Sequence, residues 1–188
     1  MEKNPEPRDH FYVGAIMVFL FVLALFILKG KLKWWLVIAT IVSVVLSWGK
    51  HFMGLTNLLI EYLPLYNKFR ATDTILVIAQ FSIPLLGILA LQKIVTGETD
   101  KKQLFRGLKY AFFITGGITL LYSVLPGIFD DFSAPTDIGS STGKSIYPEW
   151  LMPSIIEDRK NLLRADAFRS FLFIALGAAV LYLSLIHI

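Results

Sequence analysis

Five long segments without a charged side chain are the feature that most constrains this chain. They cover residues 11–28, 34–48, 74–91, 110–125 and 170–188. They are 15 to 19 residues long, against the roughly 20 residues that a helix needs to cross the apolar core of a bilayer, and the segment 34–48 is short for a full span. In lipid, helices and closed barrels are the structures that satisfy every backbone N–H and C=O group. The apolar runs are continuous and lack the alternation of a barrel strand, so the sequence predicts membrane-spanning helices.

The pattern predicts an all-α, polytopic membrane protein that forms one helical domain over residues 1–188. About five transmembrane helices are expected, with short amphipathic interfacial helices in the two outward loops. The expected helices are 11–28, 34–48, 74–91, 110–125 and 168–188, and the expected outward loops are 49–73 and 126–167.

Composition excludes several classes of site. Hydrophobic residues make up 55% of the chain, which is unusual for a soluble domain. The absence of cysteine excludes disulfides and thiolate metal sites. The three histidines lie far apart, and Asp130 and Asp131 have no third ligand nearby, so a divalent cation has no support and we expect no metal and no cofactor. No basic stripe with interleaved aromatics indicates a nucleic-acid partner.

Lysine and arginine in short loops set the orientation of a membrane protein. The link after the first predicted helix carries Lys29, Lys31 and Lys33, and the link over 92–109 carries five further cations. Both links fall on one side if the helices alternate, and this side is assigned to the cytoplasm. The N-terminus and the loops 49–73 and 126–167 are then expected to face outward.

The first outward loop contains the strongest candidate site, Tyr66-Asn67-Lys68-Phe69-Arg70. Lys68 and Arg70 precede a predicted helix that Asp73 can cap, and a helix N-terminus favours anions. These residues suit a phosphate or a lipid-linked diphosphate at the outer surface. The alternative is that the two cations contact lipid headgroups and that Tyr66 and Phe69 anchor the interface. No catalytic residue can be assigned from the pattern.

Polar and small residues inside the predicted helices indicate helix–helix contacts. Gln80 and Ser82 are expected to face neighbouring helices, and Pro84 is expected to bend the third helix. In the second outward loop, a capping box at Ser154 predicts an amphipathic interfacial helix, and Asp166 is expected to cap the last transmembrane helix.

The segment 46–91 resembles the YfhO-like bacterial membrane proteins, and the block 66–70 is its most specific part. Three other pieces fit the same family: residues 12–14, 29–35 and 157–170. The resemblance therefore extends over nearly the whole chain.

The resemblance implies a large protein of the bacterial inner (cytoplasmic) membrane, with the architecture of the C-type glycosyltransferases. Such proteins use a polyprenyl-phosphate-linked sugar at the outer face of the membrane, here to modify cell-envelope glycopolymers or lipids. The implied partners are membrane lipids, the sugar donor and the remaining helices of the full protein. Arg70 is the expected contact to the donor phosphate, with Lys68, Tyr66 and Asn67 beside it.

The family's catalytic carboxylate is expected in a loop near the start of the full protein, which this chain lacks. We therefore expect a middle to C-terminal fragment that is inactive alone. One alternative is part of a transporter or flippase for a lipid-linked substrate, favoured by a helix broken at Pro84 beside Gln80. Against it, no ionisable residue lies deep in a predicted helix. Another alternative is a non-catalytic membrane scaffold.

Overall fold

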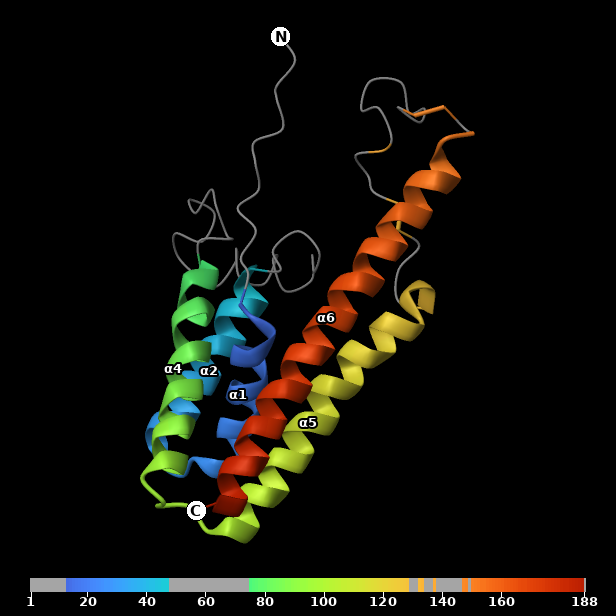
Figure 1. The fold of residues 1–188 in the computed structure, drawn as a ribbon. Coiled ribbons are helices and arrows are strands. Elements are labelled where there is room, and N and C mark those ends of the chain that lie inside the picture. The colour runs from blue at the N-terminus through green and yellow to red at the C-terminus, as the bar shows by residue number, and fades with distance from the viewer. Residues whose placement is uncertain are drawn as a thin grey trace, which may run out of the picture. The chain divides into compact units, whose positions relative to one another are not determined.

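The computed structural model describes residues 13–47, 75–128, 132–133, 137, 147–148 and 150–187. Over these residues the chain consists of five α-helices and a short 3-10 helix, without a strand (Figure 1). The elements are α1 (Ala15–Ile27), α2 (Lys31–Ser47), α4 (Leu76–Val95), α5 (Lys101–Val124), η4 (Pro126–Ile128) and α6 (Met152–His187). The all-α prediction is confirmed for this part of the chain.

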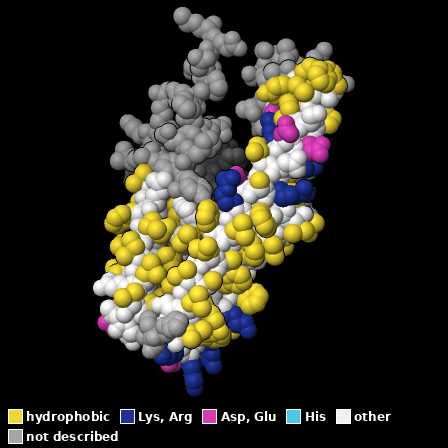
Figure 2. Space-filling view, in the orientation of Figure 1, with side chains coloured by type: hydrophobic (Ala, Val, Ile, Leu, Met, Phe, Trp, Pro, Cys, Tyr) yellow, Lys and Arg dark blue, Asp and Glu magenta, His cyan; other side chains and the backbone are white. Residues whose placement is uncertain are grey.

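Three of the described helices, α4, α5 and α6, are long and apolar enough to cross a membrane, fewer than the five predicted. With 13 and 17 residues, α1 and α2 are shorter. At 1.5 Å per residue they measure about 20 and about 26 Å, short of an apolar core about 30 Å thick. Apolar side chains cover much of the surface of both parts of the molecule (Figure 2), including exposed Phe81 on α4 and Leu176 on α6. The helices are thus compatible with a membrane protein.

The chain divides into two compact units, Met1–Leu104 and Phe105–Ile188. In the first unit α4 packs against both α1 and α2. A buried cluster joins the three helices through Ala24, Val37, Leu86 and Ala90. Each of these helices therefore buries one face and leaves another face open.

The link between α1 and α2 is only three residues long because α1 stops abruptly. Leu28 adopts extended backbone angles (φ −73°, ψ 140°), and its N–H donates a last hydrogen bond to the carbonyl of Ala24. Gly30 then has φ +119°, a conformation that side-chain-bearing residues rarely adopt. The chain re-enters a helix at Lys31, so α2 starts at the end of the unit where α1 stops.

The structure extends α5 and α6 beyond the predicted ranges. The predicted helix 110–125 begins at Lys101 in α5, because the Asp100 carboxylate accepts a hydrogen bond from the N–H of Lys102 and caps the helix. The basic segment 101–109 is therefore helical. Its buried Leu104 and Leu108, four residues apart, lie on one face of the helix.

The last two predicted helices form one continuous helix. α6 has 36 residues, which corresponds to a length of about 54 Å. No glycine or proline interrupts residues 154–176, so nothing in the sequence stops the helix between the predicted pieces. Asp166 therefore lies inside α6, where it pairs with Arg169 at 3.6 Å, and does not cap a helix.

Gly87 of α4 allows α4 to approach α1 closely. A Cβ atom at this position would lie 3.1 Å from the Cβ of Leu20, which is attached directly to the α1 backbone and cannot move by changing rotamer. Gly117 of α5 provides a matched control, because a Cβ there would meet no atom within 4 Å.

We predict that Gly87→Ala destabilises the protein relative to Gly117→Ala by about 1–3 kcal/mol, the usual cost of overpacking. The gain in helix propensity, about 1 kcal/mol, is common to both variants and cancels in the difference. Unfolding of the purified protein in mixed detergent micelles measures this difference. Equal stability of the two variants would contradict the close packing of α1 and α4.

Candidate functional site

The site predicted from sequence falls in a part of the chain that the structure does not describe. Tyr66, Asn67, Lys68 and Arg70 all lie within residues 48–74. Their role as a donor-phosphate site therefore stays a prediction. The structure does describe the residues next to this loop, and it builds two further groups of polar side chains, one in each unit.

Ser43 near the end of α2 joins the start of α4. Its hydroxyl donates a hydrogen bond of 2.5 Å to the carbonyl of Ile75, the residue before α4. About one turn earlier in α2, the hydroxyls of Thr40 and Ser82 share a buried hydrogen bond of 2.6 Å. Ser82 thus faces a neighbouring helix, as expected. The two bonds hold the end of α2 beside the start of α4, so Ser47 and Ile75, which flank the segment 48–74, lie at the same end of the first unit.

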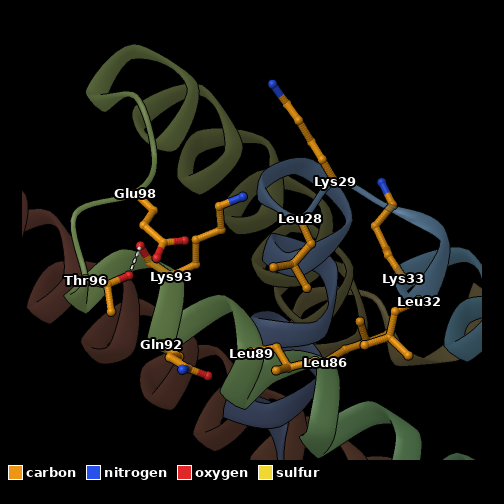
Figure 3. Close-up of a pocket in the computed structure, with 10 residues that line it drawn as sticks. All are labelled: Leu28, Lys29, Leu32, Lys33, Leu86, Leu89, Gln92, Lys93, Thr96 and Glu98. Carbon is orange, nitrogen blue, oxygen red and sulfur yellow. Dashed lines mark hydrogen bonds between the residues drawn. The ribbon is translucent and has the colours of Figure 1, made fainter.

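The opposite end of this unit holds a pocket of about 300 Å³ (Figure 3). It lies between the α1–α2 link and the last turn of α4, and Gln92 and Thr96 contribute polar groups to its wall. The remaining lining residues are four leucines, three lysines and one glutamate: Leu28, Leu32, Leu86, Leu89, Lys29, Lys33, Lys93 and Glu98. The lysine amines point to one side in Figure 3, away from the leucines. The pocket is therefore amphipathic.

Lys33 is held in place by the end of α1. Its ammonium group donates a hydrogen bond of 3.2 Å to the carbonyl of Leu25 and lies 4.8 Å from the centre of the Trp34 ring. The side-chain amide of Gln103 donates in the same way to the carbonyl of Phe26, at 2.9 Å. The last carbonyls of a helix have no partner within the helix, so these side chains supply the missing donors.

Sequence reasoning treated these lysines as signals of topology and did not identify a pocket. The available signal was the prediction that both basic links lie on one side of the membrane. The structure brings residues of both links to one pocket of the first unit. What the sequence could not supply was the position of the α4 leucines beside them.

In the second unit, Asp137 and Arg159 form a bidentate ion pair. The two guanidinium nitrogens lie 2.7 and 2.8 Å from the two carboxylate oxygens. One of these nitrogens also donates to the carbonyl of Phe132 at 2.8 Å. The Asp137 side chain is only 5% exposed, whereas that of Arg159 is 31% exposed. This pair joins Asp137 to the first half of α6, and no motif in the sequence indicates it.

Pro84 does not interrupt α4, which runs as one helix from Leu76 to Val95. Proline lacks the N–H that would bond to the carbonyl of Gln80, so one backbone bond is missing there. The helix break on which the transporter alternative depended is therefore not observed.

Comparisons of the chain with protein-family models, with curated proteins and with solved structures found no match. The resemblance to the YfhO-like proteins accordingly stays a prediction from the quoted segments.

We predict that Arg159→Ala lowers the melting temperature in detergent, because the buried Asp137 carboxylate loses its bidentate cation. Arg169→Ala is the control, since its pair with Asp166 is longer and both side chains are about 70% exposed. Exposed pairs of this kind contribute little to stability. Thermal unfolding of the two variants in the same detergent should show a clear fall only for Arg159→Ala. A fall of the same size in both variants would contradict a larger contribution of the Asp137–Arg159 pair to stability.

Proposed function

We propose that this chain is the membrane-embedded part of a glycosyltransferase-like protein of the bacterial cytoplasmic membrane. The protein takes a sugar from a polyprenyl-phosphate carrier at the outer face and transfers it to cell-envelope glycopolymers or lipids. The observation that carries the proposal is the segment 46–91, with Tyr66-Asn67-Lys68-Phe69-Arg70 at its centre.

The described structure supports this proposal through the ends of that loop. The Ser43 bond to Ile75 lies at one end of the first unit, and the pocket with Lys29, Lys33 and Lys93 lies at the other. If the lysine-rich end faces the cytoplasm, the loop 48–74 leaves the unit on the outer side. This is the side on which a polyprenyl-linked sugar would be used.

The proposed chemistry is displacement of a lipid phosphate from the anomeric carbon of the sugar. An acceptor hydroxyl forms the new C–O bond while the bond to the phosphate oxygen breaks, with inversion at the carbon. Arg70 and Lys68 stabilise the negative charge that develops on the departing phosphate. Asn67 and Tyr66 supply further hydrogen-bond donors. The base that removes the hydroxyl proton is not assigned to any residue of this chain.

We predict that Arg70→Ala in the protein as its gene encodes it lowers sugar transfer by about 100- to 1,000-fold, as for loss of one donor to a developing anion. Transfer of radiolabelled sugar from polyprenyl phosphate to the envelope fraction measures the effect. Arg106→Ala is the control, because this cation lies in the first turns of α5 and outside the loop. Unchanged transfer in a variant that inserts normally would remove Arg70 from the site and favour a non-catalytic scaffold.

The orientation can be tested directly because the chain contains no cysteine. We predict that Lys68→Cys reacts with a membrane-impermeant maleimide in intact spheroplasts. Lys31→Cys, at the start of α2, should react only after the membrane is permeabilised. The reverse pattern would put the Tyr66–Arg70 block in the cytoplasm and exclude its use of an outward-facing donor.

A further inference from the structure

We propose that the pocket between the α1–α2 link and the end of α4 binds an anionic phospholipid of the inner leaflet. The phosphate lies among the amines of Lys29, Lys33 and Lys93, and the start of an acyl chain lies against the leucines (Figure 3). The inference depends on insertion of the chain in the orientation proposed above, but not on sugar transfer.

The first argument is the charge of the pocket. Three lysines and one glutamate line it, so cations outnumber carboxylates. The two ion pairs found among the described residues are Asp137–Arg159 and Asp166–Arg169, both in the second unit. Lys29 and Lys93 therefore form no ion pair with a described carboxylate. The two ammonium groups are therefore available to an anionic ligand, and Lys33, whose ammonium group is fixed by the Leu25 carbonyl, supplies a third positive charge at the pocket.

The second argument is the apolar wall. Leu28, Leu32, Leu86 and Leu89 line the same pocket as the lysines; Leu86 is already buried by the helix packing, whereas Leu32 is 61% exposed and Leu28 and Leu89 are half-buried. A free phosphate or a nucleotide would leave this wall without an apolar partner. A phospholipid matches both halves, because its headgroup is anionic and its chains are hydrocarbon. A volume of about 300 Å³ suits the phosphate and glycerol region rather than a whole lipid.

The third argument is the depth at which the pocket would lie in the membrane. Trp34 and Trp35 in the first turn of α2 are 59% and 72% exposed, next to Lys33. Exposed tryptophans of a membrane protein lie preferentially at the level of the headgroups. Basic pockets between helices on the cytoplasmic side are suited to anionic lipid headgroups. The tryptophans thus mark the pocket as an interfacial site.

The test uses the purified protein in a mild detergent and native mass spectrometry to count bound lipids. The probes are phosphatidylglycerol and phosphatidylcholine with the same acyl chains. Wild-type protein should retain phosphatidylglycerol preferentially. Lys29→Ala/Lys93→Ala should weaken this binding about 30-fold, since each cation near an anionic lipid contributes about a factor of five. Lys33 is left intact because it also caps α1.

The matched control is Lys101→Ala/Lys102→Ala, which removes two exposed cations from the start of α5 that do not line the pocket. Equal losses in the two double variants would mean general attraction to a basic surface and would overturn the proposal. No loss in Lys29→Ala/Lys93→Ala would overturn it as well.

Glycerol 3-phosphate serves as a soluble competitor for the bound lipid. Displacement of the lipid at matched concentration would show that the leucines add nothing, and would also overturn it.

Glu98→Gln tests whether weaker lipid binding in the lysine variants results from misfolding rather than from loss of the site. Removing this carboxylate from the pocket should strengthen phosphatidylglycerol binding several-fold, a gain that an unfolded variant would not show. Absence of any gain would count against the site. Arg70→Ala should leave unchanged the phosphatidylglycerol binding that depends on Lys29 and Lys93, so the pocket and the proposed transferase activity can fail independently.

Discussion

The close contact between α4 and its neighbours is the interaction on which the first unit depends. Lipid tails are as apolar as leucine, so burial of apolar surface gives helices in a membrane little reason to associate. Small residues and hydroxyl groups have to provide the association instead. Gly87 lets α4 approach Leu20 on α1, and the hydroxyl pair of Thr40 and Ser82 joins α4 to α2. Interhelical hydrogen bonds of this kind contribute about 0.6 kcal/mol on average, so the hydroxyls determine the register of the helices more than their stability.

This packing also shapes the two ends of the unit. At one end the Ser43 bond to Ile75 keeps the end of α2 against the start of α4. At the other end the chain turns sharply at Gly30, and the side chains of Lys33 and Gln103 satisfy the last carbonyls of α1. Unpaired carbonyls at the edge of a bilayer are costly, so their donors favour a polar and basic end. Lys33, one of the lysines from which the orientation is predicted, therefore also completes the secondary structure of α1.

Much of the helical architecture follows from the uncharged segments, because lipid tolerates few other residues. The helix ends were harder to predict. Charged residues continue α5 back to Lys101 and α6 back to Met152, since a helix can extend into water where the apolar pattern stops. The lysines of the pocket were recognised, but their meeting with Leu86 depends on tertiary packing that no local pattern encodes. The pairing of Asp137 with Arg159 joins residues 22 positions apart and carries no sequence signal.

The unbroken length of α6 has a consequence for the part of the helix that precedes its uncharged residues. Its uncharged part, from Ser170, measures about 27 Å, so if this part lies in a bilayer, the part that begins at Met152 extends beyond the lipid as a continuous helix of about the same length. Arg159 lies in this part of α6 and pairs there with Asp137. Because the helix is continuous, the distance from this ion pair to the uncharged part of α6 is set by the helix itself.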